Sequence, residues 1–223
     1  MLLEKKIIND FLSVAQKYSD SITINLNEDF FSKLSLYFSL LNRWNNKLNL
    51  TRILGSEERI LEEFLVTPFL YALKLHDKTG KVLDIGSGNG IPSIFISLIN
   101  SHNFITLCEK DIKKSIFLKE VVRELSLEKV KVRCCNHDDL ILDNTQYDYI
   151  TMKNVSVKEE FINSASLLLT QNGIMFFQTS QEKINELKKV KFNKGLKLVN
   201  YYNIPVHKET YLAELTFVPR GTI

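Results

Sequence analysis

The chain has 223 residues, of which 44% are hydrophobic and 25% are charged, as in an ordinary globular protein. Its formal charge of +3 permits nucleic-acid binding through a local patch but does not predict it alone. No run of about 18 apolar residues is present, and the first residues carry charges where a signal peptide needs an apolar run. The three cysteines, Cys108, Cys134 and Cys135, form no C-x-x-C pair. We therefore expect a cytoplasmic protein with neither disulfides nor a metal site, and no contact with a membrane.

Helical patterns occupy the first third of the chain. Apolar residues recur at helical spacing over about 3–18, 28–46 and 57–76. Pro68 is expected to kink or split the third of these helices. We predict a helical N-terminal extension over residues 1–77, joined to one further unit over 78–223.

From residue 81 onward, strand and helix patterns alternate. Strands are predicted over 82–85, 104–108, 130–134, 147–152 and 173–178, with helices over 91–99, 111–125 and 157–169. This alternation predicts an α/β fold with a mainly parallel, doubly wound, Rossmann-like sheet. Two more β-rich runs, over 196–204 and 211–218, are expected to add an antiparallel pair at the sheet edge, giving about seven strands.

A glycine-rich segment, Asp84-Ile-Gly-Ser-Gly-Asn-Gly90, directly follows the first predicted strand. Its spacing is G-x-G-x-G, whereas a dinucleotide fingerprint needs a third glycine or alanine where this chain has Ile91. Glycines let backbone N–H groups approach a ligand closely. An acid just before such a loop can hold the ammonium of S-adenosylmethionine (SAM). We predict that SAM is the cofactor and that it is bound by Asp84, Gly86, Ser87, Gly88 and Gly90.

Two acidic positions follow the next strands of the predicted sheet. Glu109 comes directly after the second strand, 19 residues beyond Gly90, and should face the same crevice. A carboxylate there can accept both ribose hydroxyls of a bound adenosine. Asp138, ahead of Asp139, follows the third strand and is predicted to accept a hydrogen bond from the adenine amino group, although Asp also favours plain turns. His137 is interpreted as a bystander.

Three segments together resemble one family, the bacterial 16S rRNA guanine-N7 methyltransferases, also called glucose-inhibited division protein B. The first is Trp44-Asn-Asn-Lys-Leu-Asn-Leu-Thr51, similar to that family's W-N-x-x-x-N-L-T. The second is the run from Val82 through the glycine loop to Pro92. The third is Glu109 with Lys113-Lys114-Ser-Ile-Phe-Leu118, similar to E-x-x-x-K-K-x-x-F-L. The resemblance implies a class I SAM-dependent methyltransferase that methylates N7 of a guanine in small-subunit rRNA.

The sequence departs from the family pattern mainly on the presumed substrate side. The family's H-F-x-D-S is replaced by Phe64-Leu-Val-Thr-Pro68, its S-R-A by Met152-Lys-Asn154, and its K-G by Gln178-Thr179. Ser93 stands for a glycine, and Asn136-His-Asp138 stands for R-A-E. These departures bear on the RNA target more than on the cofactor.

The chemistry that the resemblance implies needs little acid–base assistance. Guanine N7 has a free lone pair, so alignment of N7, methyl and sulfur should supply most of the rate. Lys153, in the place of the family's arginine, is expected near the transferred methyl, where it positions the substrate by holding a phosphate or the guanine; a solvated loop lysine is the alternative. Lysine lacks the planar fork of arginine. Asn154 is a weaker candidate for contact with the base.

Basic side chains are expected to bind the RNA phosphates beside the crevice. The candidates are Arg43, Lys47, Arg52, Lys113 and Lys114, each of which can instead be a solvated surface charge. Trp44 is interpreted as a core residue. The lysine-rich stretch over 183–197 is interpreted as a solvated helix face and loop.

The favoured hypothesis is a monomeric SAM-dependent rRNA methyltransferase whose partner is ribosomal RNA or the small ribosomal subunit. A related methyltransferase acting on another RNA or a small molecule is the alternative enzyme. A non-catalytic SAM-binding protein that associates with the ribosome remains open because of the altered strand ends. An NAD-binding oxidoreductase is a minor alternative.

Overall fold

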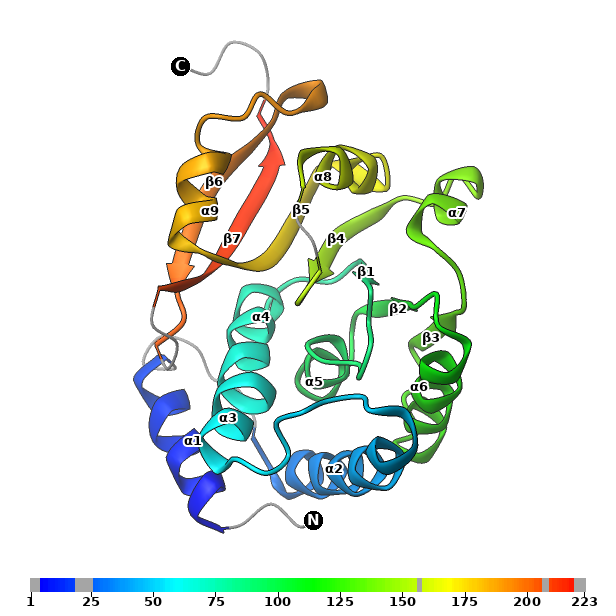
Figure 1. The fold of residues 1–223 in the computed structure, drawn as a ribbon, viewed down its shortest axis with the longest axis vertical. Coiled ribbons are helices and arrows are strands. Elements are labelled where there is room, and N and C mark those ends of the chain that lie inside the picture. The colour runs from blue at the N-terminus through cyan, green and yellow to red at the C-terminus, as the bar shows by residue number, and fades with distance from the viewer. Residues whose placement is uncertain (1–4, 19–25, 156–157, 206–208, 219–223) are drawn as a thin grey trace.

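The computed structural model describes residues 5–18, 26–155, 158–205 and 209–218. Its centre is a seven-stranded sheet with the order β3-β2-β1-β4-β5-β7-β6 (Figure 1). The strands are β1 Lys81–Ile85, β2 Phe104–Cys108, β3 Val130–Arg133, β4 Tyr147–Met152, β5 Leu169–Ser180, β6 Leu196–Asn203 and β7 Thr210–Phe217. The first five are parallel, and β7 pairs antiparallel with both β5 and β6. The predicted α/β class and the antiparallel edge pair are confirmed.

Both faces of the sheet are buried. Successive strand residues alternate between two apolar cores: Val82 and Phe176 belong to one core, Leu83 and Phe177 to the other. Side chains of a strand point alternately to opposite faces, so near-continuous apolar runs are typical of a sheet covered on both sides. The central strands can therefore present polar groups to a ligand only at their ends, whereas the edge strand β6 is largely exposed.

Nine α-helices are found in the described residues. They are α1 Lys5–Tyr18, α2 Glu28–Leu48, α3 Glu57–Ile60, α4 Thr67–Leu75, α5 Ser93–Ile99, α6 Ile112–Glu124, α7 His137–Leu142, α8 Glu159–Ser166 and α9 Gln181–Leu187. A π-helical segment, Leu61–Val66, connects α3 to α4, and Pro68 lies in the first turn of α4. The predicted third helix is thus divided before Pro68, whose missing N–H is tolerated in a first turn. None of the helices in the described ranges is long and apolar enough to cross a bilayer.

Two boundaries differ from the sequence prediction. The segment after β3, expected to be a loop, forms α7, because Asn136 and Asp139 make reciprocal side-chain-to-backbone caps. Asp138 therefore lies in the first turn of a helix. Strand β5 begins at Leu169, several residues earlier than expected, where Leu169 pairs with Tyr147 and a register shift follows.

The N-terminal helices share a core with the sheet. Phe11 of α1 and Phe30 of α2 both contact Phe95 of α5, with ring centroids 6.0 and 5.3 Å apart. The buried hydroxyl of Tyr37 on α2 donates to the carbonyl of Asn89 in the glycine loop at 2.9 Å. We propose that residues 1–77 and 78–223 form one folding unit, because this core joins them.

Candidate active site

The glycine loop lies at the carboxyl end of β1 and bends through left-handed backbone conformations. The φ angles of Gly86, Gly88 and Gly90 are 73°, 53° and 91°. A Cβ on Gly86 would come within 2.7 Å of Val155, whereas a Cβ on Gly88 would meet only the Gly86 carbonyl, at 3.7 Å. Gly86 is therefore required by the packing of the protein itself, while Gly88 faces open space of the kind that a ligand approaching the backbone needs.

The end of β2 fixes the shape of this loop. The Cys108 carbonyl accepts hydrogen bonds from the N–H groups of Gly86 at 2.9 Å and Ser87 at 3.1 Å. The buried Glu109 carboxylate accepts from the N–H of Gly88 at 2.8 Å and from that of Asp111 at 2.9 Å. A carboxylate has about four acceptor sites. Glu109 can hold the loop and still accept hydrogen bonds from a ligand.

Asp84 is a buried acid beneath the loop. The residue is only 1% exposed, and its Oδ1 accepts from the Thr151 hydroxyl at 2.9 Å. Its Oδ2 is buried and has no hydrogen-bond partner within the described residues. Burial, opposed by hydroxyl hydrogen bonds and reinforced by the charge of Glu109, raises the pKa of Asp84 to about 7. An unpartnered oxygen on a buried acid is suited to an incoming cation such as the ammonium of SAM.

A second polar cluster lies at the carboxyl ends of β4 and β5. Lys153 and Glu63 form an ion pair at 2.6 Å, and their side chains are only 7% and 14% exposed. Burial and the charges of Asp84 and Glu63 raise the pKa of Tyr71, whose hydroxyl donates to the Met152 carbonyl at 2.7 Å. Lys153 is therefore a buried, paired cation, and the alternative of a solvated loop lysine is wrong.

Two atoms near this cluster add hydrogen-bonding capacity. Thr67 Oγ1 and Gln178 Oε1 are buried and lack a hydrogen-bond partner within the part of the chain that the structure describes. Thr67 and Gln178 stand at positions where the sequence departs from the family pattern. Since unsatisfied buried polar atoms are costly, their occurrence here indicates a place where a ligand supplies the missing partners.

Asp138 lies farther out, at a groove of about 500 Å³ between α7 and α8. Its carboxylate accepts from the Ser164 hydroxyl at 2.7 Å and its side chain is 57% exposed. The neighbouring His137 is buried against the ring of Phe161, and burial lowers its pKa. Contact of Asp138 with adenine stays a prediction.

The five basic candidates differ in their surroundings. Arg43 forms an ion pair with Glu120 of α6, which also accepts from the half-buried Trp44 indole. Lys47 and Arg52 are exposed at the end of α2 and in the loop after it. The first turn of α6 contains exposed Lys113 and half-buried Lys114 but no acidic residue. The helix dipole makes a lysine unfavourable at a helix N-terminus. The presence of two lysines in this first turn therefore favours a role in binding anions.

Several residues of the site had no sequence signal. Glu63 and Tyr71 come from elements distant in the chain, and the packing of the π-helical segment and α4 against β4 brings them to Lys153 and Met152. Thr151 reaches Asp84 through the parallel pairing of β1 with β4.

A sheet of the order β3-β2-β1-β4-β5-β7-β6 with an antiparallel β7, a G-x-G-x-G loop after β1 and a carboxylate after β2 is the arrangement of class I SAM-dependent methyltransferases. Solved structures agree. Ribosomal protein L11 methylase from Lactobacillus delbrueckii subsp. bulgaricus has a TM-score of 0.57 at 12% identity, covering 70% of this chain and 79% of that one. TYW2 of M. jannaschii in complex with AdoMet has a TM-score of 0.55 at 17% identity, covering 75% and 80%. These likenesses concern the fold.

Sequence comparison narrows the class to one family. Residues 31–213 match the GidB family, described as rRNA small subunit methyltransferase G. A relative of that description from Lactococcus lactis subsp. cremoris is 30% identical over 217 residues, covering 92% of this chain and 88% of the relative. One from Brachyspira hyodysenteriae is 30% identical over 187 residues, covering 83% and 87%. The chain belongs to the rRNA small subunit methyltransferase G family, as its motifs indicated, and its methyl donor is SAM.

Replacement of Gly88 by valine should weaken SAM binding by about 100-fold or more, equivalent to roughly 3 kcal/mol. The side chain would fill the open space above the loop rather than clash within the protein. Gly195→Val is the matched control, since Gly195 also has a positive φ, of 81°, but lies outside the loop. Calorimetric titration with SAM measures both. Unchanged affinity in Gly88→Val would contradict the placement of the cofactor.

Replacement of Asp84 by asparagine should raise the stability of the ligand-free protein and weaken SAM binding. The folded-state pKa, about 7, lies above the ordinary value of 3.8, so the folded state binds more protons and stability falls as pH rises between these values. The variant has no buried carboxylate to ionise. Its free energy of unfolding should therefore exceed that of the wild type by an amount that grows from about pH 4 to about pH 7 and reaches a few kcal/mol. Urea unfolding at several pH values checks this. A variant less stable than wild type at about pH 8 would show that Asp84 is a structural acid.

Proposed function

We propose that this protein transfers the methyl group of SAM to N7 of a guanine in small-subunit rRNA. The observation that carries the proposal is the unpartnered, buried Asp84 Oδ2 beneath a glycine loop that Glu109 holds in shape. Family membership supports the rRNA substrate and the N7 position. We place the enzyme in the cytoplasm and propose that it acts as a monomer.

In this proposal, each carboxylate along the crevice holds a different part of SAM. Asp84 accepts from the ammonium, and the N–H groups of the glycine loop lie beside the amino-acid moiety. Glu109 accepts from the ribose hydroxyls, and Asp138 accepts from the adenine amino group. When bound, SAM supplies an activated methyl group that N7 attacks directly, while the electron pair of the C–S bond returns to sulfur. No proton has to leave N7, so the protein needs to orient rather than to deprotonate.

The Lys153–Glu63 pair is proposed to hold the guanine. Lysine donates to guanine O6 in other protein–nucleic acid contacts, and O6 lies beside N7 on the same edge of the base. Methylation at N7 leaves a positive charge on the base, and a buried lysine without a counter-charge would repel that product. Glu63 neutralises that lysine and fixes the position of its ammonium. A neutral pair can therefore orient the base without repelling the product.

RNA is proposed to enter over the α2–α6 side of the crevice. Lys47, Arg52, Lys113 and Lys114 supply positive charge there, and Arg43 is held by Glu120. Phosphate contacts of this kind position an RNA without reading its sequence. The half-buried Trp44 packs on Phe117 with centroids 6.2 Å apart, so it braces this side rather than stacking on a base.

The direct test uses labelled SAM, the purified protein and small ribosomal subunits that lack their guanine-N7 mark, with naked rRNA alongside. We expect label at a single guanine N7, located by mass mapping. Transfer to a different atom or to another RNA would replace the proposed target. SAM binding without any transfer would favour the non-catalytic, ribosome-associated alternative, for which the altered ends of β4 and β5 are the supporting observation.

Replacement of Lys153 by methionine should lower kcat/KM for RNA by about 10- to 100-fold, the range of a lost charged hydrogen bond, with SAM affinity unchanged. The single variant leaves Glu63 buried without its cation and is expected to be destabilised. The double variant Lys153→Met/Glu63→Met removes both charges and separates stability from activity. Lys17→Met, at an exposed lysine of α1, is the control. Full activity in a folded double variant would contradict the role of the pair.

A further inference from the structure

A second basic surface lies far from the crevice, on the segment that joins α9 to β6. The described residues 187–205 contain five lysines and no acidic residue. The lysines are Lys188, Lys189, Lys191, Lys194 and Lys197, all exposed. None of them takes part in an ion pair with another described residue. We call these five residues the α9–β6 lysine surface.

The local structure directs the side chains of these lysines toward solvent. Phe192 and Leu196 are buried between them, so the intervening lysines point to solvent. The N–H of Asn193 donates to the Asn163 side chain of α8 at 2.9 Å, which ties the segment to the body of the protein. Lys188 donates to the Tyr201 hydroxyl at 3.1 Å and lies over its ring. A groove of about 810 Å³ runs along residues 187–198 and is lined by all five lysines.

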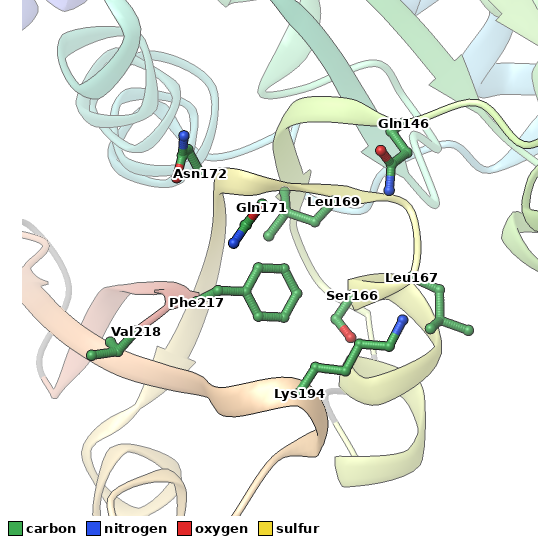
Figure 2. A pocket seen from close by; sticks show the side chains of 9 residues that line it. All are labelled: Gln146, Ser166, Leu167, Leu169, Gln171, Asn172, Lys194, Phe217 and Val218. Carbon is green, nitrogen blue, oxygen red and sulfur yellow. The ribbon is translucent and has the colours of Figure 1, made fainter. Parts of the chain in front are cut away.

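A smaller pocket of about 450 Å³ adjoins this groove and shares Lys194 and Val218 with it (Figure 2). Figure 2 shows the Phe217 ring and the Lys194 side chain at the same cavity, with Gln146 on its far side. Gln171 and Asn172 contribute further amide groups. Amides can donate to and accept from a base edge, and an aromatic ring offers a face for stacking.

We propose that the α9–β6 lysine surface and this pocket bind a second segment of the substrate RNA. The groove takes phosphates and the pocket takes one unstacked base. Amide groups and a ring beside lysines fit RNA better than a lipid surface, which needs projecting apolar side chains. The inference rests on the proposed rRNA substrate and extends it.

The position of this surface makes it a separate contact. Gln146 precedes β4 and Gln171 lies near the start of β5, so the pocket is at the amino ends of strands whose carboxyl ends carry the crevice. The six residues of β4 span about 20 Å. An RNA held at both ends of the sheet must therefore be extended or folded around the sheet edge formed by β5, β7 and β6.

The test measures binding of transcribed small-subunit rRNA by the full chain across salt concentrations from about 50 to 200 mM. Lys189→Gln/Lys191→Gln/Lys194→Gln should reduce affinity at least tenfold and lower the slope of log affinity against log salt by about 2, since each lost phosphate contact removes about 0.7. SAM affinity should not change. Lys5→Gln/Lys17→Gln/Lys131→Gln removes equal charge from exposed positions on α1 and β3 and should keep both the affinity and the slope.

A second variant tests the pocket without altering charge. Gln171→Ala/Asn172→Ala should weaken rRNA binding severalfold while leaving the salt slope unchanged. Photocrosslinking to 4-thiouridine-labelled rRNA should yield adducts on peptides within 187–218. Full affinity and slope in the triple lysine variant, with crosslinks confined to α2 and α6, would overturn the inference.

Two further results separate this inference from the proposed function. If the wild type binds rRNA through these lysines but transfers no methyl group, the inference stands and the proposed function fails. If methyl transfer proceeds and the triple variant keeps its KM for RNA, the inference fails and the proposed function stands. Binding of anionic phospholipid vesicles instead of rRNA would also overturn it.

Discussion

The site depends on the hydrogen bonds between the end of β2 and the glycine loop after β1. The Cys108 carbonyl holds two N–H groups of the loop, and the Glu109 carboxylate holds a third. Parallel pairing of β1 with β2 aligns Ile85 with Cys108, so the loop begins where the neighbouring strand ends. In the proposed binding mode the carboxylate that shapes the loop also accepts from the ribose of SAM, which couples the geometry of the backbone to the binding of the ligand.

The helical extension is part of this arrangement. Tyr37 of α2 bonds the loop at Asn89, and Glu63 of the π-helical segment pairs with Lys153 after β4. The extension therefore contributes a hydrogen bond to the glycine loop and half of the buried ion pair after β4. The π-helical segment carries Glu63, and such turns occur often at functional sites.

The same region gathers several buried ionisable groups. Asp84, Glu63 and Lys153 are ionisable groups in a nearly dry environment, with unsatisfied atoms of Thr67 and Gln178 nearby. Two apolar cores on either side of the sheet stabilise the protein enough to tolerate them. Buried charge and missing hydrogen-bond partners are stabilised when a charged ligand binds, which is the physical reason that they collect at the ends of strands rather than within the cores.

The sequence by itself determined the order of the strands, the antiparallel pair at the edge and the glycine loop, because apolar periodicity and glycine spacing are local. It also predicted Asp84 and Glu109 as site residues, since parallel strands bring the acids at their carboxyl ends to one crevice. Tertiary structure alone decided that Lys153 is buried, because its partner Glu63 is 90 positions earlier in the chain. The short helix that begins at His137 rests instead on a local signal, the capping box between Asn136 and Asp139, which outweighed the turn preference of Asn and Asp. From the sequence, the lysines between residues 187 and 198 were interpreted as solvated charges. The tertiary structure places them around a groove and beside the pocket, because it brings this segment next to residues from β5 and β7.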